Sequence, residues 1–320
     1  MDIHRCRFVD YTPQTITTTA FSHNSDPANF TPKSLRLAIG RTDGSIEIWN
    51  PRNTSTKWLL ESTIGGSAGG TVEGLVWSSP KNETPRLFSI GGSTYLTEWD
   101  TEKGIPIKNH DSNAGVIWSV ATSGNQEKIA LGCDDGSVVV VDLSGGLGTI
   151  EHERILQRQK SRVLSLCWWN DEYIIGGCAD GRIRIWSYDG ATKGRLLQTL
   201  RVDKSKTEST LVWSVLALPQ TNQLVSGDSI GSVKFWDMKH FVLQQSFTCH
   251  DADVLCLSSD ASGTKVFTSG VDRKIFNFNL VKTSKTTSKW VNSSNRLLHA
   301  NDVRTMSSYQ SKQMNLICSN

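Results

Sequence analysis

Short stretches of alternating apolar and polar residues recur along the chain, and each ends on a large side chain followed by a polar one. The alternation has the two-residue period of a strand with one buried face. Six such anchors follow one another at spacings of 50, 42, 45, 50 and 42 residues: Trp49, Trp99, Val141, Trp186, Trp236 and Phe278. A period of this length is typical of chains in which each repeat forms one four-stranded sheet.

The turn before each anchor defines the register of the repeat. A glycine lies five residues before four of the anchors, at Gly44, Gly136, Gly181 and Gly231. Aspartate precedes the first three glycines, and Asp-Gly accepts the positive φ of a tight hairpin turn. No segment has a convincing helical period. The pattern therefore predicts an all-β fold, a WD40 β-propeller.

The spacing also predicts the number of blades. With a mean of about 46 residues between anchors, a seventh anchor is due just beyond residue 320, so we expect a seven-bladed propeller whose last blade is incomplete in this chain. The expected blades cover residues 15–65, 71–110, 114–158, 162–206, 210–250 and 253–299, with a partial seventh at 302–320. Residues 3–10 precede the first blade without a partner. We expect them to form the outer strand of the seventh blade, because propellers commonly close with a terminal strand.

Three histidines stand just before predicted first strands. In WD repeats a histidine there hydrogen-bonds toward the turn aspartate and the anchor tryptophan, which locks the blade. The predicted locking residues are His110, His250, His299, Asp43, Asp135, Asp180, Trp49, Trp99, Trp186 and Trp236. The alternative is metal binding or general-base chemistry. Histidines that recur once per blade do not converge on one point, so the structural interpretation is favoured.

The sequence offers no enzyme signature. Cys133 and Cys178 occupy equivalent repeat positions, which indicates a repeated buried side chain and not a unique thiol. The glycine-rich segment 65–70 lacks the Lys-Ser/Thr of a phosphate loop. Trp168 and Trp169 could stack on a nucleic-acid base, although Trp168 fits the end of a core strand. We predict no catalytic residue, no cofactor, no metal site and no small-molecule substrate.

Composition and charge narrow the function classes. The chain has seven cysteines with no Cys-x-x-Cys pair, no run of 18 apolar residues and no secretory signal at its start. Its net charge of +3 is too small to indicate nucleic acid by itself. Basic residues nevertheless gather in two acid-poor connections, which are either solvated loops or an RNA-binding surface. The RNA-binding candidates are Lys193, Arg195, Arg201, Lys204, Lys206, Lys282, Lys285 and Lys289.

Two segments carry a more specific resemblance than the repeats do. The opening residues 4–8, His-Arg-Cys-Arg-Phe, and residues 158–166, Arg-Gln-Lys-Ser-Arg-Val-Leu-Ser-Leu, resemble the cirhin family. The resemblance extends over essentially the whole chain. Short segments such as Asn50-Pro51-Arg52 are similar to the yeast form, which implies a fungal source. Members have two tandem propellers, so the chain corresponds to the N-terminal one.

The resemblance implies a non-catalytic nucleolar scaffold. Cirhin is a WD-repeat subunit of the t-UTP (UtpA) subcomplex of the small-subunit processome. Family members assemble with other UTP subunits, bind the 5′ external transcribed spacer of nascent pre-rRNA and are needed for small-subunit (18S) rRNA maturation. Two rival hypotheses stay open: a peptide-binding WD40 adaptor in a ubiquitin-ligase or chromatin complex, and a propeller hydrolase with a metal in its channel.

Overall fold

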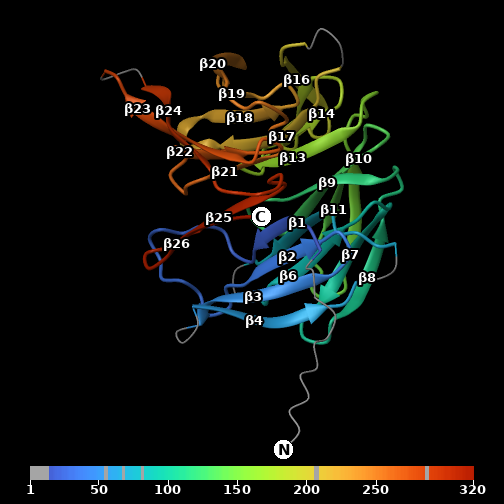
Figure 1. Cartoon of the computed structure of the whole chain (residues 1–320). Helices are drawn as coiled ribbons and strands as arrows, with labels where there is room; N and C mark the ends of the chain where they lie inside the picture. Colours follow the sequence, from blue (N-terminus) through green and yellow to red (C-terminus); the bar gives the residue numbers. More distant parts are fainter. Residues whose placement is uncertain (1–13, 54–56, 67–68, 81–82, 205–208, 285–287) are drawn as a thin grey trace, which may run out of the picture.

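A computed structural model describes residues 14–53, 57–66, 69–80, 83–204, 209–284 and 288–320. In these residues the chain forms six four-stranded antiparallel sheets and one two-stranded sheet (Figure 1). The first strands of successive sheets contact each other in order, and the last of them contacts the first sheet again. The predicted all-β propeller is therefore confirmed, with six complete blades.

The first three blades lie between residues 16 and 155. Blade one consists of β1 (Ile16–Phe21), β2 (Leu37–Arg41), β3 (Ile46–Asn53) and β4 (Lys57–Ile64). Blade two consists of β5 (Gly74–Ser78), β6 (Arg86–Ile90), β7 (Tyr95–Asp100) and β8 (Ile105–Asp111). Blade three consists of β9 (Ile117–Thr122), β10 (Lys128–Cys133), β11 (Val138–Asp142) and β12 (Glu151–Ile155).

The next three blades repeat this order. Blade four consists of β13 (Val163–Trp169), β14 (Tyr173–Cys178), β15 (Arg182–Ser187) and β16 (Leu196–Arg201). Blade five consists of β17 (Val212–Leu218), β18 (Gln223–Asp228), β19 (Ser232–Asp237) and β20 (Val242–Thr248). Blade six consists of β21 (Cys256–Ser259), β22 (Lys265–Ser269), β23 (Lys274–Lys282) and β24 (Ser288–Leu297).

Helical structure in the described residues is confined to two 3-10 turns, η1 (Gly190–Thr192) and η2 (Pro219–Thr221). No helix in this part of the chain has the length and apolar character needed to cross a bilayer.

Asp-Gly turns set the register of the middle strands as the sequence predicts. Asp135 Oδ1 accepts a hydrogen bond from the Ser137 backbone N at 2.9 Å, which closes the turn between β10 and β11. Gly136 has a φ of 85°, and a Cβ there would lie 2.0 Å from the Gln159 carbonyl oxygen. Only glycine fits this position, because it combines a left-handed backbone with close approach of the next loop.

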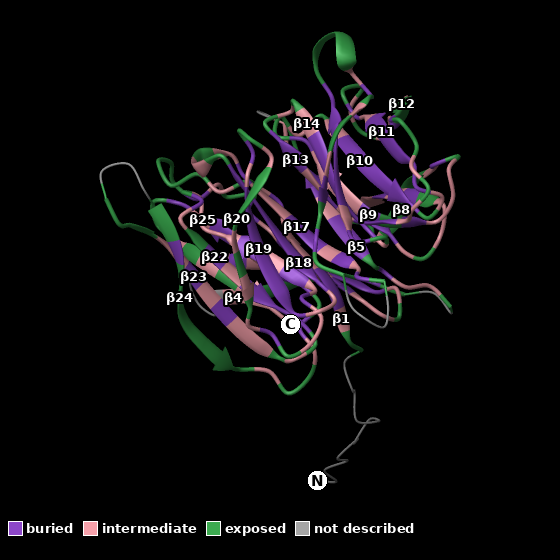
Figure 2. Ribbon diagram, turned by 90° about the horizontal axis from the view of Figure 1, so that it is seen from above, coloured by how far each residue is buried: buried purple, intermediate pink, exposed green. Residues whose placement is uncertain are grey.

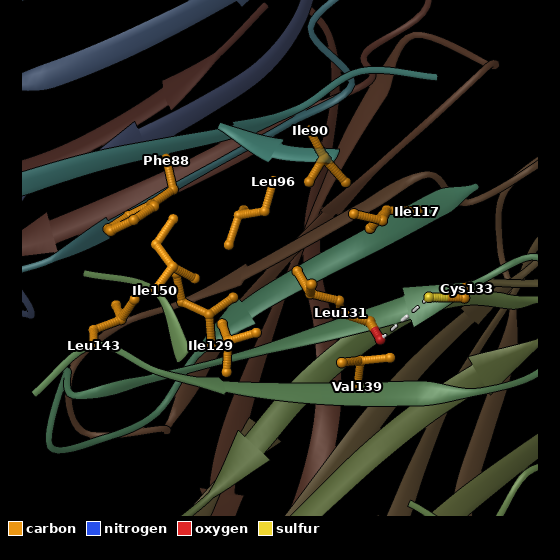
Figure 3. Close-up of a cluster of buried hydrophobic side chains, with 11 residues drawn as sticks. Phe88, Ile90, Leu96, Ile117, Ile129, Leu131, Cys133, Val139, Leu143 and Ile150 are labelled. Atoms are coloured by element: carbon orange, nitrogen blue, oxygen red, sulfur yellow. Dashed lines mark hydrogen bonds between the residues drawn. The ribbon is translucent and has the colours of Figure 1, made fainter. Parts of the chain in front are cut away.

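Apolar side chains bury the faces between neighbouring blades. In Figure 3, Phe88 and Leu96 of blade two point toward Ile129 and Leu131 of blade three, and all four are fully buried. Figure 2 shows burial concentrated in the inner strands of each blade and exposure at outer strand β24. Burying one such side chain stabilises the fold by about 1.5–3 kcal/mol. The continuous apolar runs of the middle strands follow from burial on both faces.

The prediction of seven blades is not confirmed. The seventh position holds a sheet of two strands, β25 (Met306–Gln310) and β26 (Asn315–Ser319). Strand β25 contacts β21 of blade six on one side and β1 of blade one on the other. The expected outer strand at residues 3–10 lies outside the described residues. In the described residues this sheet has no third or fourth strand.

Polar contacts join this two-stranded sheet to blade one. The Thr19 backbone N donates to Thr305 Oγ1 at 3.0 Å, and Asn320 Nδ2 donates to the Ile16 carbonyl at 3.1 Å. The loop from β1 to β2 also reaches the sheet, where the Asp26 backbone N donates to the Gln310 carbonyl at 2.8 Å. Hydrogen bonds therefore close the ring between the two-stranded sheet and blade one.

Candidate nucleic-acid interface

Each blade presents loops on two faces of the ring. We call the turn face the one that carries the turn between the second and third strands and the connection from each outer strand to the next inner strand. The opposite face carries the other two sets of loops.

Strand β16 runs from the opposite face to the turn face, and the first predicted basic stretch lies at both of its ends. Its six residues span roughly 20 Å, at about 3.3 Å per residue. The structure therefore divides that stretch between the two faces.

On the opposite face, Lys193 belongs to an ion-pair network that joins blades three and four. Its Nζ lies 2.8 Å from Glu153 Oε1 and 4.3 Å from the centre of the Tyr188 ring. Lys128 Nζ lies 2.6 Å from the other oxygen of the same carboxylate. Burial alone would raise the pKa of Glu153, but hydrogen bonds from Lys128, Lys193 and Tyr188 lower this pKa to about 2. The charge of Lys193 is thus balanced, whereas Arg195 is exposed.

On the turn face, Arg201 ends β16 and Lys204 follows it, and both side chains are exposed. Lys206 lies outside the described residues. The second basic stretch belongs to blade six, where exposed Lys282 and Lys289 lie at the loop end of the β23–β24 hairpin on the opposite face. Lys285 also lies outside the described residues. Blade five separates the two stretches, so the structure does not bring the RNA-binding candidates together.

Of the predicted locking histidines, His250 makes one of the two expected contacts, that to a turn aspartate, and its second contact is to a threonine. Its Nδ1 lies 3.0 Å from Asp272 Oδ2 in the turn before β23, and its Nε2 lies 2.8 Å from Thr268 Oγ1 in β22. A carboxylate only accepts, so Nδ1 carries the proton in the neutral ring and the threonine hydroxyl donates to Nε2. Burial lowers the pKa of His250, and the hydrogen bond to Asp272 opposes that shift. The anchor of this blade is Phe278 and not a tryptophan.

His299 repeats half of this arrangement in the two-stranded sheet. Its Nε2 lies 2.9 Å from Ser319 Oγ in β26, the second strand of that sheet. The spacing of 49 residues between His250 and His299 equals that between Val254 and Val303, each of which donates its backbone N–H to the preceding blade.

His110 does not occupy a locking position, which corrects the prediction. It lies within outer strand β8, opposite Leu96, and its buried Nε2 has no hydrogen-bond partner among the described residues. The matching carbonyls show why: Val116 and Asp253 each accept a backbone hydrogen bond from the turn after the second strand, donated by Asp134 and Val271. His250 precedes that carbonyl by three residues, whereas His110 precedes it by six. A histidine three residues further from the inner strand falls back into the outer strand.

Two of the three predicted turn aspartates bond within their own turns. Asp43 Oδ1 accepts from the Ser45 backbone N at 3.0 Å, and Asp135 makes the equivalent contact with Ser137. Asp180 instead binds the Arg184 guanidinium at 2.9 and 2.7 Å. Among the hydrogen bonds of the described residues, none joins these three carboxylates to a histidine.

The four anchor tryptophans find acceptors other than histidine. Two of them donate Nε1–H to a serine of the second strand: Trp99 to Ser89 Oγ at 2.7 Å and Trp236 to Ser226 Oγ at 2.9 Å. Trp49 donates to Glu47 Oε2 at 2.9 Å, and Trp186 donates to the Gln157 carbonyl at 3.0 Å. The predicted residues therefore form separate local contacts and not one repeated network.

Sequence reasoning missed how blade five replaces its turn aspartate. Asp228, at the end of β18, accepts a hydrogen bond from the Ser232 backbone N at 3.0 Å. This is the bond that a turn aspartate would make at position 230, where this blade has Ile230. The other carboxylate oxygen of Asp228 lies 3.4 Å from Nζ of Lys234, whose side chain is 1% exposed, and the same Nζ lies 3.0 Å from Asp203. A lysine in the alternating run before Trp236 was the available signal, because that position points into the blade.

Sequence reasoning also gave no role to Arg182, which pairs in register with Arg201 across β15 and β16. The Arg-Ile-Arg-Ile alternation of β15 was the available signal, since it places Arg182 and Arg184 on one face of the strand.

The described residues hold no group of three or more His, Cys, Asp or Glu side chains placed to bind a metal ion. Burial raises the pKa of the Cys133 thiol to about 12 and that of Cys178 to about 11. Both are fully buried side chains at equivalent positions in β10 and β14, so their arrangement does not favour thiolate chemistry.

Comparison with known proteins identifies the repeats and the family. The model described as "WD domain, G-beta repeat" matches residues 150–187 and 241–279. Each match begins at the outer strand of one blade and ends in the third strand of the next, so each sequence repeat spans two blades.

Three proteins with one name resemble this chain over nearly all of its length. The U3 small nucleolar RNA-associated protein 4 of Saccharomyces cerevisiae is 56% identical over 100% of this chain and 41% of its own length. The Schizosaccharomyces pombe protein of that name is 46% identical over 100% of this chain and 44% of its own. The Homo sapiens homolog is 31% identical over 95% of this chain and 42% of its own length. The chain spans less than half the length of these relatives. It belongs to the cirhin family of WD40-repeat proteins, whose fungal relatives are named U3 small nucleolar RNA-associated protein 4.

Proposed function

We propose that this chain is part of a non-catalytic scaffold of ribosome biogenesis, a nucleolar subunit of the small-subunit processome. It binds nascent pre-rRNA, including the 5′ external transcribed spacer, together with other t-UTP (UtpA) subunits for maturation of 18S rRNA. The observation that carries the proposal is the 56% identity to the yeast protein along the entire chain. The name of that relative records association with U3 small nucleolar RNA.

We propose that this propeller has seven blades in the whole protein, and that the two-stranded sheet is the start of the seventh blade. Its support is that β25 already lies between β21 and β1, and that the His299–Ser319 contact repeats the His250–Thr268 contact of blade six. The blade ranges proposed from the sequence, from 15–65 to 302–320 with 3–10, follow from that division.

For RNA contact we propose the basic residues of both faces. Phosphates are neutralised by lysine and arginine side chains that are free of other ion pairs. Because Lys193 is paired with Glu153, the stronger candidates are Arg195, Arg201, Lys204, Lys282 and Lys289, with Lys206 and Lys285 retained from the sequence.

The test is ultraviolet crosslinking of the tagged chain in fungal cells, followed by sequencing of the bound RNA. Enrichment of the pre-rRNA spacer is the expected result. Charge reversal is then made separately on each face, at Arg201 and Lys204 or at Lys282 and Lys289. If both reversals leave the crosslinks unchanged, the assignment of these residues is wrong.

The peptide-binding adaptor has one specific observation in its favour. Trp118, near the start of inner strand β9, is 41% exposed, and the Arg162 guanidinium lies 4.3 Å above its ring. An exposed tryptophan at this end of an inner strand suits capture of a peptide side chain. The adaptor predicts recovery of a protein partner and no enrichment of RNA in the crosslinking experiment, which would overturn the ribosome-biogenesis proposal.

A further inference from the structure

Two arginines face each other at the turn-face end of blade four. Arg182 of β15 and Arg201 of β16 are direct cross-strand partners, so their side chains lie on the same side of the sheet. Like charges at such positions destabilise a strand pair. Where a local rule is broken in this way, a functional role for the broken position is the physical expectation.

The nearby carboxylates offset the two charges only in part. Asp180 lies 3.7 Å from Arg182, but it is bound at 2.7 and 2.9 Å by Arg184, whose side chain is 4% exposed. Burial alone would raise the pKa of Asp180, but the hydrogen bond and charge of Arg184, together with the charge of Arg182, lower it, so one ionised carboxylate is shared between two arginines. Asp203 contacts Lys234 Nζ at 3.0 Å instead.

A surface pocket of about 320 Å³ opens at the same place. Its lining consists of Asp180, Gly181, Arg182, Arg201, Val202, Lys204, Ser209 and Thr210. Neither Arg201 nor Lys204 has an ion-pair partner within the described part of the chain, and both are exposed. The Val202 backbone N donates to the Gly181 carbonyl at 3.1 Å, which holds the loop that follows β16 against the β14–β15 turn. The three cations are therefore carried by backbone segments that are bonded to each other.

We propose that this pocket binds a phosphate group of an RNA backbone, with the Arg182 and Arg201 guanidinium groups and the Lys204 ammonium as its ligands. This inference rests on the proposed function, in which the chain contacts pre-rRNA, and it names one place and one chemistry for that contact. A bound phosphate relieves the repulsion between the two arginines, because each guanidinium gains a charge-assisted hydrogen bond. Arginine suits such a site, since its planar fork matches phosphate oxygens.

The surroundings favour RNA over a phosphorylated peptide. The loop from β12 to β13 also lies on the turn face and carries exposed Lys160, between Arg158 and Arg162, which pair with Asp135 and Asp134. The Ala179 backbone N donates to the Arg162 carbonyl at 3.0 Å, so this loop adjoins the turn that forms the pocket. A further cation at Lys160, beside the pocket, fits a polymer with a phosphate at every residue, whereas a phosphopeptide offers a single group.

The test compares two double variants of the whole chain that remove the same charge. Arg201→Gln/Lys204→Gln empties the pocket of two ligands, and Lys33→Gln/Lys239→Gln removes two exposed lysines on the opposite face. Binding of a fluorescent single-stranded RNA oligonucleotide is measured by anisotropy between 50 and 200 mM salt. Two lost phosphate contacts should reduce the slope of log affinity against log salt by about 1.4, which is roughly 25-fold in affinity at 0.1 M salt. The control variant should keep the slope of the unaltered chain.

A thermal melt separates binding from folding. Because the pocket substitutions remove like-charge repulsion, the melting temperature of Arg201→Gln/Lys204→Gln should equal or exceed that of the unaltered chain. A fall in melting temperature that accompanies the loss of affinity would mean a structural role and would overturn the proposal. So would a variant that binds RNA as the unaltered chain does, and this result would leave the proposed function standing.

Two further outcomes are decisive. If the pocket variant loses affinity for a phosphoserine peptide but keeps its affinity for the RNA oligonucleotide, the site takes a phosphopeptide and the RNA assignment is wrong. If the unaltered chain binds no RNA, the RNA contact of the proposed function fails together with the inference.

Discussion

Blade six and the two-stranded sheet that follows it share a histidine contact, which has two partners in blade six and one partner in the two-stranded sheet. In blade six, the His250 side chain is 0% exposed and bonds to both Thr268 and Asp272. In the two-stranded sheet, His299 is half-buried and bonds to Ser319. The hydroxyl partner belongs to the second strand of a blade, and the carboxylate belongs to the turn that leads to the third. Two strands are thus enough to form half of the polar contact, and the turn that leads to the third strand adds the carboxylate.

The largest effect should come from removing the apolar anchor that only the complete blade has. Phe278 is 0% exposed and packs in the cluster between blades five and six. Phe278→Ala should lower the free energy of unfolding by about 3–5 kcal/mol, since it removes buried surface and leaves a cavity. Urea unfolding followed by tryptophan fluorescence measures the change. Val281→Ala, on the same strand but 45% exposed, is the control and should change stability by under about 0.5 kcal/mol. Equal losses in the two variants would contradict this account.

An intermediate effect is expected from the carboxylate that completes the network. Asp272 accepts hydrogen bonds from His250 Nδ1 at 3.0 Å and from the Lys274 backbone N at 3.1 Å. Asp272→Asn should cost about 1–3 kcal/mol, because an amide cannot satisfy every donor that the carboxylate satisfies. Asp302→Asn, before β25, makes the same chemical change at a solvent-exposed carboxylate 3.7 Å from Arg304, and it should cost under about 1 kcal/mol. A larger loss for Asp302→Asn in urea unfolding would show that the two-stranded sheet depends on its own aspartate.

The smallest effect should be a change in the pH dependence of stability. Burial lowers the pKa of His250 in the folded chain, so the unfolded chain binds a proton more readily. The stability contributed by the neutral ring is complete above the unfolded pKa near 6.5 and is lost as pH falls toward the lower folded value. One proton accounts for at most about 1.4 kcal/mol per pH unit.

The measurement is the melting temperature of three chains at pH 7.5 and at pH 5.5. His250→Gln should show a smaller fall on acidification than the unaltered chain. His299→Gln is the matched change in the two-stranded sheet, and it should retain the fall of the unaltered chain. If His299→Gln removed the fall and His250→Gln did not, the assignment of the acid-sensitive group to blade six would be wrong.

Residue types with a repeated spacing predicted the blades well because each is set by local geometry. Asp-Gly turns such as Asp135-Gly136 define where two strands meet, whatever the rest of the ring does. The histidines were harder, because a blade-locking histidine is defined by its distance from the inner strand. His250 and His110 look alike in sequence, yet a difference of three residues in the following loop moves His110 into an outer strand.

Charges were the least predictable feature, because their partners come from other blades. Lys193 reads as a free basic residue, but Glu153, which neutralises it, lies 40 residues earlier in the chain. The cross-strand pair of Arg182 and Arg201 depends on the register of β15 and β16. The sequence does not define this register, because it does not define the length of the connection between the two strands.

The offset between sequence repeats and blades bears on how such a ring can lengthen in evolution. A repeat such as residues 241–279 contributes the outer strand of one blade and three strands of the next. Duplication of that unit inserts a new boundary in the middle of a sheet, where strand pairing joins old and new segments at once. Backbone hydrogen bonds therefore pair the added copy with the segments on both of its sides, before any side chain has changed to fit it. The unit of inheritance and the unit of folding differ by one strand, and that difference lets the ring grow without leaving an unpaired edge between copies.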